Sequence, residues 1–258
     1  MSVSMAHEFV LFLNWSMNCE RVRSHRRFWG FILLSCLFAA AAPNPSAASG
    51  AALAATPISP DPELENLLRG VENKYNRLKT LRLHFQQSYR QGQQILREEA
   101  GTLYLRKPAQ MRWEYENPEP KLFLAEGKRL TLYLPEENRL TETEVANSDD
   151  LRSPLRFLLG GLRFQKEFQQ IERAPDVPPI DSGDVVIKAV PKLMQNRLEW
   201  VELEITPQYQ IRRMILKEPG GVQTEFQFKD EEADLRLAPE LFHFQPPKGT
   251  QIIKSEGQ

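Results

Sequence analysis

The chain has 258 residues, of which 41% are hydrophobic and 26% charged, and its formal net charge is −1 at pH 7. This near-neutral balance excludes the strongly basic surface that nucleic-acid binding requires. The length fits one large domain or two modest ones, and residues 1–54 do not read as part of either.

Residues 1–54 are predicted to be a cleaved signal peptide. Four arginines between residues 21 and 27 precede an apolar run over residues 28–42, and the small residues around Ala54 suit a cleavage site. The apolar run ends after fifteen residues, whereas about 20 are needed to span a bilayer. An uncleaved membrane anchor is the alternative interpretation.

Both cysteines lie in this leader, so the mature chain is expected to contain neither disulfides nor thiol chemistry. Residues 33–36 weakly resemble a lipoprotein cleavage box, which would place an acyl group on Cys36. Without the leader's four basic and two acidic residues, 29 basic and 32 acidic residues remain, a net charge of −3. We expect a linker at 55–62, one domain at 63–253 and a polar tail at 254–258.

The first element of the mature chain is predicted to be an amphipathic helix. Asp61 is the expected N-cap and Pro62 the first helical residue. Apolar residues then recur at helical spacing on one stripe: Leu64, Leu67, Leu68, Val71, Tyr75 and Leu78. The stripe predicts a helix that packs on the apolar face of a sheet.

From residue 81 the apolar period changes to two, which predicts strands. They are expected near residues 81–89, 94–106, 111–116, 121–126, 129–134, 138–144, 162–173, 184–190, 198–206, 209–217 and 222–229. The links are too short for the crossovers that parallel pairs need. The sequence therefore predicts an antiparallel meander.

The clearest alternation lies in residues 101–135 and predicts one apolar strand face. We expect this face to line an apolar cavity. The predicted lining residues are Leu103, Leu105, Met111, Trp113, Leu130 and Leu132. Lys107 is the one cation expected on this face.

A short apolar helix is predicted where the strand pattern breaks, between Ser153-Pro154 and Gly160-Gly161. Its apolar residues are Leu155, Phe157, Leu158 and Leu159. Two turns of helix this apolar are not stable alone, so the segment must lie on another surface. It is either a core plug or a movable lid on the cavity.

Catalytic motifs are missing from the sequence. Without the leader, His84 and His243 are the only histidines and no cysteine remains, so a zinc site of Cys and His ligands is not expected. Paired carboxylates such as Glu98-Glu99 are expected to be solvated, although a glycosidase pair remote in sequence stays an alternative. We predict no enzyme and no cofactor.

Together these elements predict a mainly β (α+β) fold: an incomplete antiparallel β-barrel with an N-terminal helix and a short helical lid covering an apolar cavity. Such a shell suits a carrier of acyl chains, because burying one CH₂ contributes about 0.8 kcal/mol.

The sequence resembles the LolA family, the periplasmic outer-membrane lipoprotein carrier proteins. The resemblance covers Tyr75–Gln87, the G-x-L-x-x-x-x-P pattern of Gly101–Pro108, Arg112-Trp113 with Pro118, the hairpin at 126–133, Pro154–Leu159 and Phe242–Gly249. It implies acylated lipoproteins as cargo, an inner-membrane ABC transporter that delivers them and an outer-membrane receptor lipoprotein that accepts them. It also implies a monomer in the periplasm of a Gram-negative bacterium.

The resemblance further implies that Lys107 latches the lid. In the family a basic residue just before the proline of the Gly101–Pro108 pattern holds the lid shut through hydrogen bonds, and the best-known members have Arg there. Lys offers three donors but no planar fork. Arg106 would substitute only in a shifted register, and the alternation favours Lys107.

Two other binding functions stay open. Shells similar to those of the LolA family also occur in carriers or sensors of other envelope lipids, such as glycolipids. A receptor-type partner of similar fold would carry lipid on Cys36.

Overall fold

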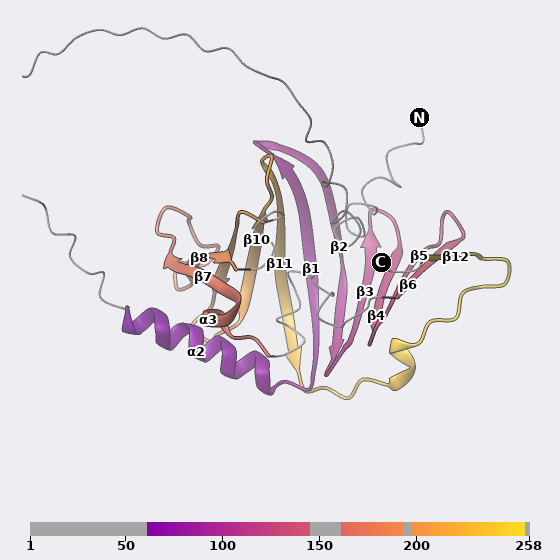
Figure 1. Cartoon of the computed structure of the whole chain (residues 1–258), viewed down its shortest axis with the longest axis horizontal. Helices are drawn as coiled ribbons and strands as arrows, with labels where there is room; N and C mark the ends of the chain where they lie inside the picture. Colours follow the sequence, from indigo (N-terminus) through magenta and orange to yellow (C-terminus); the bar gives the residue numbers. More distant parts are fainter. Residues whose placement is uncertain (1–60, 145–160, 193–197, 256–258) are drawn as a thin grey trace, which may run out of the picture.

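The structure is a computed structural model that describes residues 61–144, 161–192 and 198–255. The predicted signal peptide and the predicted lid residues 155–159 lie outside these ranges. Figure 1 shows a broad sheet with helix α2 across the ends of several strands.

The described strands form one twelve-stranded sheet in the order β12-β6-β5-β4-β3-β2-β1-β11-β10-β9-β8-β7. The first six are β1 Thr80–Gln91, β2 Gln94–Arg106, β3 Gln110–Asn117, β4 Lys121–Glu126, β5 Arg129–Leu134 and β6 Arg139–Glu144. The others are β7 Phe168–Arg173, β8 Val185–Pro191, β9 Trp200–Ile205, β10 Ile211–Lys217, β11 Val222–Ala233 and β12 Gln251–Ser255. The sheet is open, with β12 and β7 at its edges, which confirms the mainly β, non-closed architecture.

The prediction of one strand over 162–173 was wrong at its beginning. Residues Phe164–Glu167 form a short helix, α3, and β7 begins at Phe168. Phe164 and Phe168 are four residues apart and their rings stack with centroids 5.9 Å apart. Four-residue spacing of a packed pair is helical rather than extended, which explains the local departure.

The predicted strands pair antiparallel, as expected, but the sheet has a further strand that was not predicted, β12, and it pairs with β6 in parallel. Strand β11 ends at Ala233, and the chain then passes through the short 3₁₀ helix η3, Pro239–Phe242, before β12 begins at Gln251. The connection from β6 to its parallel neighbour β12 contains β7 to β11 and is far longer than the crossover that a parallel pair needs. Lys254 and Ser255, which were assigned to a polar tail, pair with Glu142 and Thr143 in this strand.

Helix α2, Pro62–Arg77, begins as predicted. The Asp61 side chain accepts hydrogen bonds from the backbone N–H groups of Glu63 and Leu64, at 3.0 and 3.1 Å. The predicted stripe faces the sheet, and its most buried members are Leu64, Leu68, Val71, Tyr75 and Leu78. The N-cap residue and the helical spacing of the apolar residues were sufficient to predict this helix.

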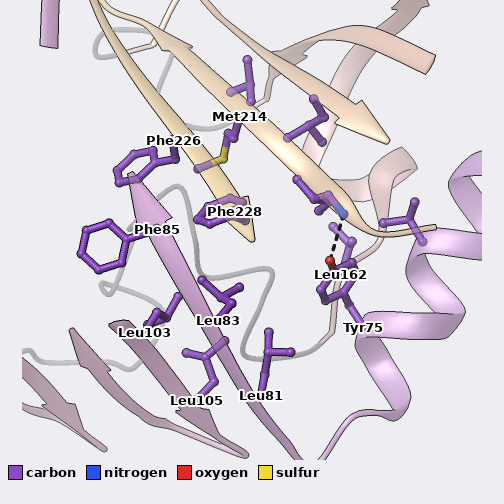
Figure 2. Packing of buried hydrophobic residues seen from close by; sticks show 14 of the residues in the cluster. Tyr75, Leu81, Leu83, Phe85, Leu103, Leu105, Leu162, Met214, Phe226 and Phe228 are labelled. Atoms are coloured by element: carbon purple, nitrogen blue, oxygen red, sulfur yellow. Dashed lines mark hydrogen bonds between the residues drawn. The ribbon is translucent and has the colours of Figure 1, made fainter. Parts of the chain in front are cut away.

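The hydroxyl of Tyr75 fastens helix α2 to the sheet. It donates to Glu231 Oε2 of β11 at 2.7 Å and accepts from the backbone N–H of Ile211 in β10 at 2.9 Å (Figure 2). Lys74 adds an ion pair to the same carboxylate at 2.9 Å. Burial raises the pKa of Tyr75 well above its usual value, so this hydroxyl acts as a neutral donor.

The C-terminal segment packs on the opposite side of β3 and β4. Phe242 is fully buried there, and the guanidinium of Arg106 lies 4.9 Å from the centre of its ring. Arg112 donates to the carbonyl oxygen of Leu241 at 2.9 Å. Three strand residues on this outer side are also buried: Leu122, Leu124 and Leu140. This smaller core holds the segment between β11 and β12 against the outer side of the sheet.

The apolar inner face as candidate functional site

One face of the sheet, here called the inner face, is apolar from strand to strand. Directly opposed residues in neighbouring strands point to the same face, and Leu103 of β2 lies opposite Leu83 of β1 and Trp113 of β3. The register continues through β4 to β5. It brings the six predicted cavity residues to this face: Leu103, Leu105, Met111, Trp113, Leu130 and Leu132.

All six side chains are buried, with exposed fractions between 0 and 8%. Five of them belong to the main hydrophobic cluster, and Leu132 is buried outside it. The cluster continues through β1 into β11 and β10. Figure 2 shows Leu83 and Phe85 of β1, Phe226 of β11 and Met214 of β10 facing the same interior. The prediction therefore named only one half of the face. The alternation Phe226, Phe228 was the available signal for the other half.

Aromatic rings form the part of the inner face that follows the leucines in the direction away from helix α2. The Phe85 ring meets Trp113 at a centroid distance of 4.7 Å and Tyr115 at 5.0 Å, both edge to face. Phe226 lies 5.8 Å from Trp113. Edge-to-face contacts add favourable energy beyond the area that the rings bury, so they stabilise this part of the inner face.

Gly101 allows β2 and β3 to approach each other beside these rings. A Cβ atom at this position would lie 1.9 Å from the backbone oxygen of Glu114. The register between the two strands shifts at the same point, between Ala100 and Gly101. The glycine of the G-x-L-x-x-x-x-P pattern is thus required by a close backbone contact.

Lys107 lies at the end of the inner face that adjoins helix α2. Its ammonium donates to the backbone oxygen of Tyr75, in the last turn of the helix, where carbonyl groups lack helical partners and favour a cation. Its backbone N–H donates to the backbone oxygen of Lys79 at 2.9 Å. Burial lowers the pKa of Lys107, and the negative charge of Asp234 opposes that shift.

Arg106 points away from Lys107, as expected for neighbouring residues at the end of a strand. Its Nε donates to Gln110 Oε1 at 2.5 Å, and its guanidinium packs on Phe242 of the outer side. Lys107 is therefore the basic residue of this pair on the inner face. Its predicted latch role stays a prediction, because residues 155–159 are outside the described ranges.

Helix α2 also holds the chain just after the predicted lid. The side-chain oxygen of Asn76 accepts from the backbone N–H groups of Gly161 and Leu162, both at 2.9 Å. Its amide nitrogen donates to the Leu162 oxygen at 2.9 Å, and Glu72 accepts from the Phe164 N–H at 2.7 Å. Sequence reasoning missed these two polar helix residues, since their partners lie more than 80 positions away.

The end of the inner face beyond the aromatic rings is polar, and here one prediction was wrong. Glu99 was expected to be solvated, but it is only 4% exposed. It lies opposite Gln87 on the inner face, and both Arg97 and Lys121 approach its Oε1 to 2.5 Å. Two cations make the burial of a carboxylate tolerable. Its neighbour Glu98 is exposed, as predicted.

Two small cavities, of about 230 and 240 Å³, lie among the described residues, and the second reaches the polar end of the inner face at Gln87 and Glu99. The first is lined by residues that include Leu124, Arg129 and His243, and the second by residues that include Ser88 and Glu225. None of the six predicted cavity residues lines either one. The candidate site is therefore the inner face itself.

Within the described ranges, no three His, Cys, Asp or Glu side chains are grouped so that they would hold a metal ion. The helices of the same ranges include none that is long and apolar enough to cross a membrane.

Fold and face together define a mainly β protein in which the described strands form one open sheet, with an apolar face and a helix across one end. Residues 76–245, more than half of the chain, match the family model described as "Outer membrane lipoprotein carrier protein LolA". The chain belongs to the LolA family, which confirms the resemblance found in the sequence.

Two similar proteins are both named outer-membrane lipoprotein carrier protein. The one from Nitrosomonas europaea is 24% identical over 76% of this chain and 93% of its own length. The one from Nitrosospira multiformis is 29% identical over 68% of this chain and 82% of its own length.

Solved structures that show similarity to this chain include a LolA superfamily protein from Nitrosomonas europaea and the lipoprotein LppX from Mycobacterium tuberculosis. The first has a TM-score of 0.41 and 8% identity, and covers 70% of this chain and 97% of its own. The second has a TM-score of 0.43 and 12% identity, and covers 69% of this chain and 98% of its own.

Proposed function

We propose that this protein is a periplasmic carrier that binds lipoprotein acyl chains against its inner face. In this proposal it collects acylated lipoproteins from an inner-membrane ABC transporter and passes them to an outer-membrane receptor lipoprotein. Membership of the LolA family and the names of its relatives support a lipoprotein carrier. They also favour the periplasm as its compartment.

The observation that carries the proposal is the continuous apolar inner face. The six predicted residues and the rings of Phe85 and Phe226 form one surface that crosses the sheet. Each CH₂ group moved from water onto such a surface contributes about 0.8 kcal/mol. Because these side chains are already buried, cargo must replace contacts that the face makes with its own chain. The net binding free energy is then the difference between the packing of the face on the cargo and its packing on the rest of the protein. Because this difference is small, binding stays reversible.

We further propose that residues 155–159 cover the inner face and that Lys107 holds the helix end of the assembly closed. Two observations on helix α2 support this arrangement. The oxygen of Tyr75 receives the Lys107 ammonium, and the adjacent Asn76 binds Gly161 and Leu162. The proposed latch and the residues just after the proposed lid therefore both bind the last turn of helix α2.

Introducing a charge at Met111 tests the binding face. The variant Met111→Asp should bind an acylated peptide at least tenfold more weakly than the wild type, measured by fluorescence anisotropy of a labelled lipopeptide. Gln110→Asp is the matched control, because Gln110 is the next residue of β3 and contacts Arg106 on the other side. If Met111→Asp folds and binds the lipopeptide normally, the assignment of the face is wrong.

Mass spectrometry of the protein purified from the periplasm identifies its cargo. Bound lipoprotein is the expected result, whereas glycolipid as the only ligand would overturn the proposal. The same measurement reports the mature N-terminus, and an acyl group on Cys36 would indicate a receptor-type partner instead.

A further inference from the structure

A layer of polar side chains closes the inner face beyond its aromatic rings. Gln87 lies two residues after Phe85 on β1, opposite Glu99 of β2, and both are buried, with 3 and 4% exposed. The Tyr115 hydroxyl donates to Gln87 Oε1 at 3.1 Å, while its ring contacts Phe85. The layer is thus continuous with the apolar surface.

Glu99 is the charged centre of this layer. Arg97 and Lys121 each approach its Oε1 to 2.5 Å. The Lys121 ammonium also lies 4.1 Å from the centre of the Tyr115 ring, so the charge cluster contacts the aromatic part of the inner face. These contacts hold the carboxylate in one orientation next to the apolar surface.

The second oxygen of this carboxylate is the unusual feature. Glu99 Oε2 is buried and has no hydrogen-bond partner among the residues that the structure describes. Within the same residues Glu204 Oε2 also lacks a hydrogen bond, but Arg213 forms an ion pair with it at 2.8 Å. A buried polar atom without a partner is costly and calls for an explanation. A ligand that carries a donor would satisfy it.

We propose that Glu99 Oε2 accepts a hydrogen bond from the amide N–H at the head of a bound acyl chain and so selects N-acyl lipids over lipids that contain only esters. The proposal rests on the carrier function proposed above, because an acyl chain on the inner face must end in its linkage group. An amide supplies one donor, whereas an ester supplies only acceptors. A fixed carboxylate oxygen repels those acceptors, so it discriminates against the wrong linkage.

This selectivity suits a carrier of lipoproteins that works between two membranes. A lipoprotein with an N-acylated terminal cysteine offers an amide N–H directly at the end of an acyl chain. Membrane glycerophospholipids are joined to their acyl chains through esters alone. Glu99 would then reject the lipid that surrounds the cargo in the membrane.

Two matched lipopeptides test the proposal. They have the same acyl chains and peptide, but in one of them an ester oxygen replaces the N-acyl amide N–H. We expect the wild-type mature protein to bind the amide at least tenfold more tightly, which is about 1.4 kcal/mol. In Glu99→Gln the ratio should fall close to one, mainly through weaker binding of the amide. Glu98→Gln, at the exposed neighbouring position, should keep the wild-type ratio.

The outcomes separate this inference from the proposed function. If the wild type binds both lipopeptides equally well, the amide subsite is wrong and the carrier function stands. A preference that survives unchanged in Glu99→Gln also overturns the subsite. If the wild type binds neither lipopeptide, both proposals fail. The wild-type ratio needs no variant, so the test remains valid even if Glu99→Gln does not fold.

Discussion

The two ends of the inner face differ in how the protein satisfies a buried charge. At the helix end the Lys107 ammonium meets a neutral backbone oxygen of Tyr75. At the polar end the Glu99 carboxylate meets two cations, Arg97 and Lys121, through a single oxygen. The helix end joins elements of the fold to one another. The polar end leaves a buried acceptor atom without a donor within the described residues.

This difference indicates separate tasks for the two ends. Tyr75 and Asn76 of helix α2 contact three different parts of the chain. The Tyr75 hydroxyl binds Glu231, the Asn76 side chain binds Leu162, and the Tyr75 backbone oxygen accepts from Lys107. These contacts hold helix α2 against the end of the inner face. At the polar end the ion pairs of Glu99 lie within β2 and between β2 and β4, and Lys121 also packs on the Tyr115 ring. The apolar region between the ends is where an acyl chain would lie.

The largest expected effect comes from closing the space beside Gly101, between the two ends. In Gly101→Ala the new Cβ would overlap the backbone oxygen of Glu114, so β2 and β3 must separate. We expect a loss of about 2–4 kcal/mol in the free energy of unfolding, measured by urea denaturation.

The control is Gly127→Ala in the turn after β4. Gly127 has a positive φ, of 59°, which Gly101 does not have, but no atom lies within 4 Å of its added Cβ. Its cost should be about 1 kcal/mol, from backbone strain alone. Equal losses in the two variants would show that the close approach at Gly101 is not what sets the stability of this region.

Removing the Tyr75 hydroxyl should weaken the helix end by a smaller amount. Tyr75→Phe leaves the Ile211 N–H without its acceptor and removes one donor from Glu231. A buried donor left unpaired costs about 1–3 kcal/mol. Tyr209→Phe, at a position that is 41% exposed, should change thermal unfolding little. Lipopeptide selectivity should survive in Tyr75→Phe, since Glu99 is at the other end; a changed amide-to-ester ratio would contradict the separation of the two ends.

Most of the strand pattern was predictable because short turns fix the register between neighbours. Once the period of two is known for residues 101–135, parity alone assigns Leu103 and Lys107 to one face and Arg106 to the other. Neither assignment needs information from distant parts of the chain. The same holds for helix α2, whose N-cap and apolar stripe are local signals.

The features that the sequence did not predict depend on partners far away in the chain. The burial of Glu99 requires Lys121, which arrives from β4 after the intervening strand β3. The parallel pairing of β12 requires β6, more than 100 residues earlier. Local charge density favours exposure for a Glu-Glu pair, and only the assembled sheet shows that one member is turned inward.

The smallest stability effect should come from Lys107, and it separates a structural anchor from a latch. Lys107→Leu removes the bond to the Tyr75 oxygen but also removes the cost of burying the ammonium, which is the reason its pKa is lowered. We expect a net loss of about 1 kcal/mol in urea denaturation. Lys107→Arg keeps a cation with more donors and should stay near the wild type.

The release of a labelled lipopeptide then decides the role of Lys107. If it latches a cover over the inner face, Lys107→Leu should release cargo several-fold faster, and Lys107→Arg should release it more slowly than Lys107→Leu. Faster amide hydrogen exchange at the C-terminal end of helix α2 should accompany the change in Lys107→Leu, because the Tyr75 oxygen loses its cationic partner. Unchanged release in both variants, together with faster exchange in Lys107→Leu, would mean that Lys107 anchors the helix without controlling the cargo.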